Sequence, residues 1–158
     1  MQKAAHISDC EKYRYSLSRE WDETKKSCLL IMLNPSKADA TINDPTITRC
    51  IHFAKSWGYG SLQVVNLFAY RATQRARLKR VLDPVGEETD TILLKHAKKA
   101  DAIVCAWGID GTFLGRNKEV LQLLKKEGYS IHCIACTKEG EPKHPLYLRK
   151  DAQMKEMH

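Results

Sequence analysis

The chain has 158 residues, a formal net charge of +7, 43% hydrophobic residues and 28% charged residues. This length suits one domain with a substantial buried core, and the balance of hydrophobic and charged residues excludes a largely disordered chain. No stretch approaches the roughly 20 apolar residues that span a bilayer, and the N-terminus has no continuous apolar signal region, so a cytoplasmic protein without a membrane partner is expected.

The predicted elements begin with residues 13–21, which alternate apolar and polar side chains and indicate an added antiparallel strand. The apolar run 28–33 follows. It is short, continuous and bounded by turn residues, which is typical of a strand buried on both faces. Asp44 and Pro45 then provide an N-cap and a first helical position, and the helix they start ends near Gly58.

The second half of the chain repeats this alternation of strands and helices. Residues 62–67, 102–106 and 131–135 are further short apolar runs that predict strands. One helix is predicted between the first two of these runs, beginning after Asp83-Pro84. Another is predicted before the last run and ends at Gly128, which stands where a C′ glycine belongs.

Strands that alternate with helices over crossovers of this length pair in parallel, and right-handed crossovers place helices on both faces of the sheet. The predicted fold is therefore α/β, a three-layer α/β/α sandwich with a central four-stranded parallel sheet and a possible N-terminal antiparallel strand. Residues 1–158 are expected to form a single domain, with a core at about 28–149 and a polar tail at 150–158.

The six cysteines favour a reducing compartment, because several lie inside apolar runs where a thiol behaves as a small buried hydrophobe. Cys133 and Cys136 form a C-x-x-C pair, which in other settings marks metal or redox chemistry. A zinc site would need a second pair or two well-spaced histidines, and neither is visible. Buried thiols are the preferred interpretation, and no metal or cofactor is expected.

Polar segments follow each of the four predicted parallel strands. In a parallel sheet, ligands bind beyond the carboxyl ends of the strands, so segments that leave these ends share one edge of the molecule. Taken singly, each segment is a common turn or strand end, whereas their joint order is more informative. The segments are Leu33-Asn34-Pro35-Ser36, Val64-Val65-Asn66, Ala106-Trp107-Gly108 and His144-Pro145-Leu146.

This series resembles the uracil-DNA glycosylase superfamily, whose members place Asp or Asn before Pro after the first strand, a base-reading Asn after the second, a Trp-Gly-like turn after the third and a His-Pro-Ser loop near the end. Residues from about 28 to 149 also resemble a bacterial and phage family catalogued only as domain of unknown function 1643. That resemblance rests on Asn-Pro-Ser with a downstream Asp-Pro-Thr, Val-Asn-Leu-Phe, Asp-Pro-Val-Gly and His-Pro-Leu-Tyr.

The glycosylase resemblance implies two catalytic residues and one residue that reads the base. Asn34 would hold the attacking water, Asn66 would hydrogen-bond the Watson–Crick edge of a base, and His144 would stabilise negative charge on the departing base. Because an asparagine cannot accept a proton as a carboxylate can, a general base is either absent or supplied by a nearby acid. The candidates are Asp39, Asp44 and Asp110.

The resemblance also implies a surface that holds the substrate. An everted base needs an aromatic or apolar wall, a wedge that replaces it in a duplex, and basic groups that hold phosphates. Phe68, Tyr70 or Trp107 would supply the wall and Leu146 or Tyr147 the wedge. The expected binding residues are Pro35, Ser36, Asn66, Phe68, Tyr70, Arg71, Trp107, Gly108, Leu146 and Tyr147.

The basic residues are clustered at Arg71, Arg75, Arg77, Lys79 and Arg80, a pattern that favours nucleic acid but also suits a solvated surface. The leading hypothesis is a hydrolase of an N-glycosidic bond acting on DNA or a nucleotide. One alternative is a non-catalytic module that binds nucleic acid or protein. The other is a hydrolase or transferase of a small nucleotide, with residues 108–115 holding phosphate at a helix N-terminus. The oligomeric state stays open.

Overall fold

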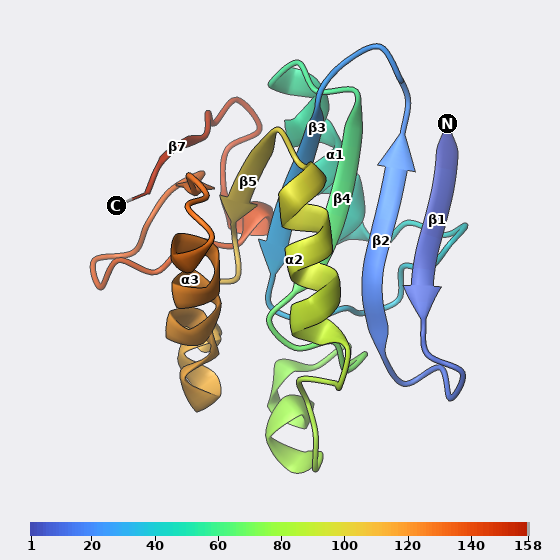
Figure 1. Cartoon of the computed structure of the whole chain (residues 1–158), viewed down its shortest axis with the longest axis vertical. Helices are drawn as coiled ribbons and strands as arrows, with labels where there is room; N and C mark the ends of the chain where they lie inside the picture. Colours follow the sequence, from blue (N-terminus) through green and yellow to red (C-terminus); the bar gives the residue numbers. More distant parts are fainter. Residues whose placement is uncertain (158) are drawn as a thin grey trace.

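The computed structural model describes residues 1–157 as one mixed seven-stranded sheet with helices on its faces (Figure 1). The strands are β1 (Gln2–Ile7), β2 (Arg14–Glu20), β3 (Ser27–Met32), β4 (Ser61–Asn66), β5 (Ala102–Cys105), β6 (His132–Cys133) and β7 (Lys155–Glu156). The α-helices are α1 (Pro45–Ser56), α2 (Thr89–Lys99) and α3 (Arg116–Lys126), and the 3₁₀ segments are η1 (Arg75–Arg80), η2 (Ile109–Gly115) and η3 (Pro145–Tyr147).

The sheet has the order β1-β2-β4-β3-β5-β6-β7. The four strands predicted from apolar runs are β3, β4, β5 and β6. The three pairs that these strands form with one another, β3–β4, β3–β5 and β5–β6, are parallel, as expected. The predicted N-terminal antiparallel strand is also present as β2, which pairs with β4. The predicted number of strands is wrong, because β1 and β7 add two further antiparallel strands at the edges of the sheet. Exposed β1 and two-residue β7 carry too little hydrophobic pattern to be recognised.

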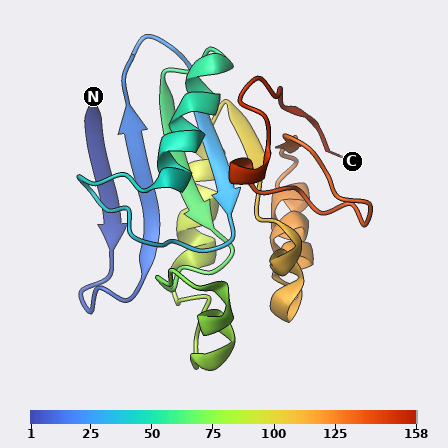
Figure 2. The ribbon, with the colours of Figure 1, turned by 180° about the vertical axis from the view of Figure 1, so that it is seen from behind.

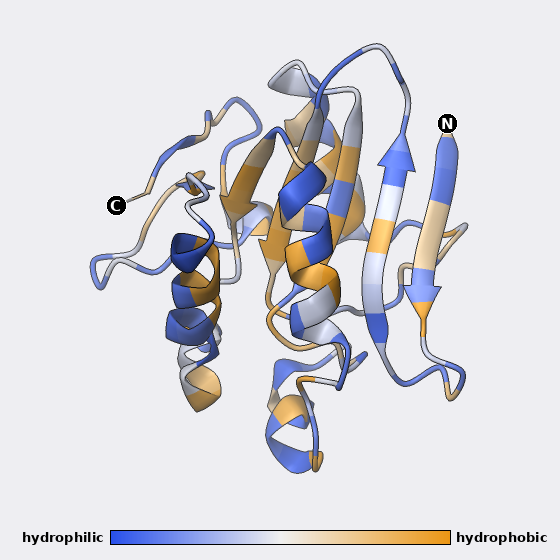
Figure 3. Cartoon of the chain, in the orientation of Figure 1, coloured by the Kyte–Doolittle hydropathy of each residue, from blue (hydrophilic) through white to orange (hydrophobic). Residues whose placement is uncertain are grey.

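Helices cover both faces of the sheet. α1 lies on the face seen in Figure 2, and α2 and α3 lie on the opposite face. Two apolar cores result, one between the sheet and α1 and the other between the sheet and the α2–α3 pair. Figure 3 shows hydrophobic residues concentrated on β3 and β5 and hydrophilic residues on the outer side of α3. No helix within residues 1–157 is long and apolar enough to cross a membrane.

The start of α1 is built as its sequence predicts. Asp44 is the N-cap, its side chain accepts a hydrogen bond from the backbone N–H of Ile47, and Pro45 occupies the first helical turn. The buried residues of α1 include Ile47, Cys50, Ile51 and Ala54, whose spacing places them on one face of the helix. This capped N-terminus lies beside the carboxyl ends of β3 and β4, because the loop after β3 leads directly into it.

The C-terminal segment differs from the expected polar tail. The predicted strand 131–135 is reduced to the two residues of β6, and β7 pairs with it along the sheet edge. The backbone N–H of Met157 donates to Ile131 O at 2.8 Å, and the Trp57 indole N–H donates to Ala152 O at 3.0 Å. Tertiary hydrogen bonds therefore hold a segment whose own pattern is polar, and residue 158 lies outside the described residues.

Candidate functional site

A polar pocket lies at the carboxyl ends of β3 and β4. It brings together the three residues to which the sequence analysis gave catalytic or base-reading roles, Asn34, Asn66 and His144, although up to 110 positions separate them. The loop after β3, the last residue of β4 and the segment before η3 all reach this one point. The lining residues are Arg14, Met32, Asn34, Pro35, Ser36, Asp44, Thr46, Ile47, Val64, Asn66 and His144.

The pocket is narrow. The volume open to the centres of water molecules is about 40 Å³, which has room for roughly three waters. Met32, Val64 and Ile47 give it apolar walls, and the other lining side chains are mostly polar. A nucleobase is larger than this space, so the pocket does not admit a base in this conformation.

Asn66 supplies the most unusual feature of this pocket. The residue is only 2% exposed, and within residues 1–157 neither its amide oxygen nor its amide nitrogen has a hydrogen-bond partner from the protein. Buried polar groups are nearly always paired, because each unpaired donor or acceptor destabilises the fold by roughly 1–3 kcal/mol. Asn66 therefore presents one free acceptor and one free donor group side by side in the pocket.

The amide of Asn34 is held in a single orientation. Its Nδ2 donates to Pro35 O at 3.0 Å and to Ala72 O at 2.8 Å, which ties the loop after β3 to the segment after β4. The backbone N–H of Ala72 donates in turn to Pro35 O at 2.9 Å. Since both amide hydrogens are engaged, the carbonyl oxygen Oδ1 is the atom that can accept a hydrogen bond from a water or ligand.

His144 is a neutral imidazole with a defined tautomer. Burial is the main cause that lowers its pKa to about 4, and the nearby Arg75 cation lowers it further. Its Nδ1 accepts a hydrogen bond from the backbone N–H of Leu146 at 3.2 Å. The ring proton therefore sits on Nε2, and His144 can donate a hydrogen bond without carrying a charge.

Arg14 and Asp44 add opposite charges to the pocket. Arg14 is 2% exposed, its Nη1 donates to Ala38 O at 3.1 Å, and its Nε has no protein partner among the described residues. Burial lowers the Arg14 pKa to about 10, and the carboxylate of Asp44 opposes that shift. The Asp44 oxygens accept hydrogen bonds from Ile47 N at 2.9 Å and from Ala38 N at 3.2 Å.

Arg14 and Thr46 line the pocket but were not predicted from the sequence, whereas Asp44 was. Arg14 lies on β2, where the alternating pattern gives no sign that an arginine is buried. β2 pairs with β4, and Arg14 at the start of β2 lines the same pocket as Asn66 at the end of β4. Thr46 lines it because α1 starts at the pocket.

Two aromatic residues expected to form the wall of a base pocket do not reach it. Phe68 is fully buried in the core on the α2–α3 face, where its ring lies 5.5 Å from that of Phe113. Trp107 is 1% exposed in the same core, and its indole N–H donates to Glu141 Oε2 at 3.0 Å. The physical reason is that both side chains point to the sheet face opposite α1, whereas the pocket opens on the α1 side.

The other expected binding residues surround the pocket. Tyr70 and Arg71 line a neighbouring groove that shares Ser36 with the pocket. Leu146 lines a second groove along α1 that shares Asp44 with it. Tyr147 is 74% exposed, and its ring lies 5.7 Å from that of His144. Gly108 lies next to His144, since a Cβ atom added to Gly108 would be 3.9 Å from the Cβ of His144.

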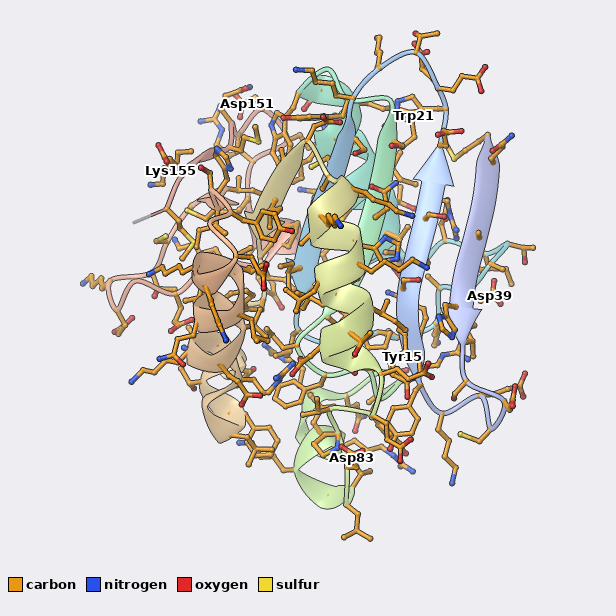
Figure 4. All side chains as sticks on the ribbon, in the orientation of Figure 1. Tyr15, Trp21, Asp39, Asp83, Asp151 and Lys155 are labelled. Carbon is orange, nitrogen blue, oxygen red and sulfur yellow. The ribbon has the colours of Figure 1, made fainter. Side chains whose placement is uncertain are left out.

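The remaining candidate acids are engaged elsewhere. Asp39 Oδ1 accepts hydrogen bonds from the backbone N–H groups of Thr41 and Ile42, which closes a turn in the loop beside β1 (Figure 4). Asp110 pairs with Arg75 at 2.8 Å. Of the three candidate general bases, only Asp44 lines the pocket.

The glycines of residues 108–115 serve packing and turn geometry. A Cβ on Gly111 would lie 2.2 Å from Cδ1 of the buried Trp107, so only glycine fits there. Gly115 adopts the left-handed conformation at the N-cap of α3, with φ 67°. The next residue, Arg116, is buried and pairs with Asp90 and Glu119 at 2.8 Å.

Four residues of the basic cluster, Arg75, Arg77, Lys79 and Arg80, belong to η1, which projects at the same edge of the sheet. Leu78 anchors η1 in the core, and Arg77, Lys79 and Arg80 are exposed around it. Figure 1 shows η1 beyond the carboxyl ends of β3 and β4, the edge at which the pocket lies. Positive charge is thus available close to the pocket.

Comparison with protein-family models finds a match over residues 14–146 to a family described as a protein of unknown function, DUF1643. This span contains every residue that lines the pocket. No curated protein and no solved structure matches the chain.

Proposed function

Because the chain belongs to the DUF1643 family, whose function is unknown, we propose a function from the pocket itself: the protein recognises a nucleobase in DNA and hydrolyses its N-glycosidic bond. The order of the Asn-Pro, Asn, Trp-Gly and His-Pro segments is similar to that of the uracil-DNA glycosylase superfamily and supports this assignment. The convergence of Asn34, Asn66 and His144 on one pocket is what that similarity requires.

The observation that carries the proposal is the unpaired amide of Asn66. A buried donor and acceptor side by side match the paired acceptor and donor on the Watson–Crick edge of a nucleobase. A bound base would satisfy both groups at once, which converts an unfavourable feature of the free protein into binding free energy. Asn66 is therefore the base-reading residue.

The chemistry follows from the other pocket atoms. A water that donates a hydrogen bond to Asn34 Oδ1 attacks the sugar C1′, the C1′–N bond breaks, and its electron pair leaves with the base. The Nε2–H of His144 donates a hydrogen bond to the base anion, and Asp44 is placed to take the water proton because it lines the same pocket. Stabilising a developing anion with a preorganised donor is commonly the largest catalytic contribution.

Entry of a base requires the pocket to open, because its volume of about 40 Å³ is too small for one. Its rim consists of the loop between β3 and α1 and the segment that leads into η3, neither of which is a β-strand. The exposed arginines and lysine of η1 lie at the same edge and are placed to hold backbone phosphates while the base enters.

Catalysis is tested with single-stranded and duplex oligonucleotides that carry uracil, mismatched thymine, or oxidised and modified bases. Abasic sites are detected as alkali-labile breaks. The expected result is cleavage at one class of base by the wild-type protein and its loss in Asn34→Ala, Asn66→Ala and His144→Ala. Gln63→Ala is the matched control, since Gln63 lies on β4 outside the pocket and its side chain donates a hydrogen bond to Ser61 Oγ.

Each variant is checked by thermal unfolding, so that loss of fold is separated from loss of chemistry. Salt-dependent DNA binding that needs Asn66 but yields no abasic site with any base would assign a non-catalytic recognition module instead. Binding that is equal in wild-type protein and Asn66→Ala would overturn base recognition at this pocket.

A further inference from the structure

We propose that Cys133 and Cys136 form a thiol–disulfide exchange site, which cycles between a dithiol and an intramolecular disulfide by reaction with small-molecule disulfides. The two thiols belong to a Cys-x-x-Cys motif, and their sulfur atoms lie 3.2 Å apart without a bond between them. A disulfide needs an S–S distance of about 2.05 Å, so closure requires a movement of only about an ångström.

The backbone around the pair is already ordered. Cys136 forms an antiparallel bridge with Pro142, and the N–H of Lys143 donates to Ala135 O at 2.8 Å. Cys133 is the second residue of β6 and pairs with Cys105 on β5. Both sulfurs are thus attached to hydrogen-bonded backbone that keeps them in contact.

The two thiols differ in access, which assigns them different steps. Cys136 is partly exposed, whereas Cys133 is 1% exposed and only Cys136 is within reach of an external disulfide. Burial, together with the hydrogen bond to Cys136, raises the pKa of Cys133 to about 12, so its thiol is not the first nucleophile. Among residues 1–157, no group of three or more metal-ligating side chains suited to a metal ion is present, which favours redox over metal chemistry for the pair.

The exchange proceeds in two balanced steps. The Cys136 thiolate attacks a disulfide RSSR, forms a Cys136–S–S–R mixed disulfide and releases RS⁻, which takes up the proton to give RSH. Cys133 then loses its proton as it attacks the sulfur of Cys136, forms the Cys133–Cys136 disulfide and releases a second RSH. The two thiols supply the two electrons that reduce RSSR.

The experiment equilibrates the full-length protein with glutathione buffers of increasing oxidised fraction, blocks remaining thiols with N-ethylmaleimide and digests with trypsin. Cys133 and Cys136 fall in one tryptic peptide, 127–138. The expected product is this peptide without maleimide and lighter by two hydrogens than the dithiol form. The same titration in urea measures the unfolded chain, and the folded protein is expected to form the disulfide at least tenfold more favourably.

Variants separate the two steps. Cys133→Ser should accumulate a stable glutathione adduct on Cys136, and Cys136→Ser should form none at Cys133. Cys10→Ser is the matched control, because Cys10 is exposed and remote in sequence from the pair, and it should leave the 133–136 disulfide unchanged. The proposal is overturned if the folded protein stays fully alkylated in buffers that oxidise the unfolded chain, or if glutathione adds to Cys133 instead of Cys136.

Discussion

Replacing Asn66 by leucine is expected to stabilise the fold and to abolish the proposed recognition of a nucleobase. Leucine keeps the branching of asparagine at Cγ, and its two larger methyl groups have the open space of the pocket, about 40 Å³, to occupy. The substitution removes a donor and an acceptor that are both buried and unpaired. Most substitutions of buried residues destabilise a protein, so a gain in stability here would be informative.

The magnitude follows from the two unpaired groups. Each destabilises the folded state by roughly 1–3 kcal/mol, and replacement by an apolar group of the same shape removes that penalty. Taking the lower end for both groups gives a gain of about 2 kcal/mol in the free energy of unfolding. For a chain of this size, that gain raises Tm by about 4–8 °C.

The assay compares urea and thermal unfolding of wild-type protein, Asn66→Leu and Asn117→Leu. Asn117 is the matched control, since it is also buried, at 4% exposure, but its Nδ2 donates to Glu141 Oε1 at 2.6 Å. Its substitution should lower the free energy of unfolding by about 1–3 kcal/mol. A loss of stability in Asn66→Leu as large as that in Asn117→Leu would refute the reasoning, because Asn66 would then be a paired structural residue.

Three further predictions follow from the structure. The pKa of His144 is about 4 in the folded protein and about 6.5 in the unfolded chain. Between these pH values the unfolded chain binds a proton that the folded protein does not. The free energy of unfolding should therefore fall by about 2–3 kcal/mol as the pH drops from 6.5 to 4. His144→Gln should lose that part of the pH dependence in urea unfolding, and an unchanged slope would contradict the assignment. Gly111→Ala should destabilise the protein by about 2 kcal/mol or more in the same assay, because the new Cβ overlaps the buried Trp107 ring; unaltered stability would show that the ring has room to move. Replacing Arg77 and Arg80 together by alanine should make the plot of log affinity against log salt concentration less steep by about 1.4 for single-stranded DNA. An unchanged slope would show that η1 does not contact the DNA.

The hydrophobic pattern of the chain was sufficient to predict its parallel core. Continuous apolar runs and a well-capped helix gave the four central strands, the alternation with helices and the start of α1 at Pro45. The edges of the sheet were harder to predict. β1 is mostly exposed and β7 has two residues, so their backbone hydrogen bonds, and not burial, decide that they are strands.

Some residues of the candidate site could be predicted from the sequence, and others could not. Asn34, Asn66 and His144 stand at or beyond predicted strand ends, where a parallel sheet places its ligands, and the resemblance to the glycosylases is what singled them out there. Phe68 and Trp107 were chosen by the same logic but face the other side of the sheet. A difference of one position along a chain leaving a strand reverses the direction of the side chain, and sequence spacing does not show where that reversal falls.

Sequence alone determined the secondary structure of the core and the edge of the sheet at which polar segments would gather, because both depend on local periodicity and on the direction of parallel strands. Only the tertiary structure decided that Arg14 of β2 is buried in the pocket, that Asn66 has no partner there, and that the sulfurs of Cys133 and Cys136 are in contact. These features depend on pairing between segments far apart in the chain, and pairing of that kind follows from the packing of the whole molecule.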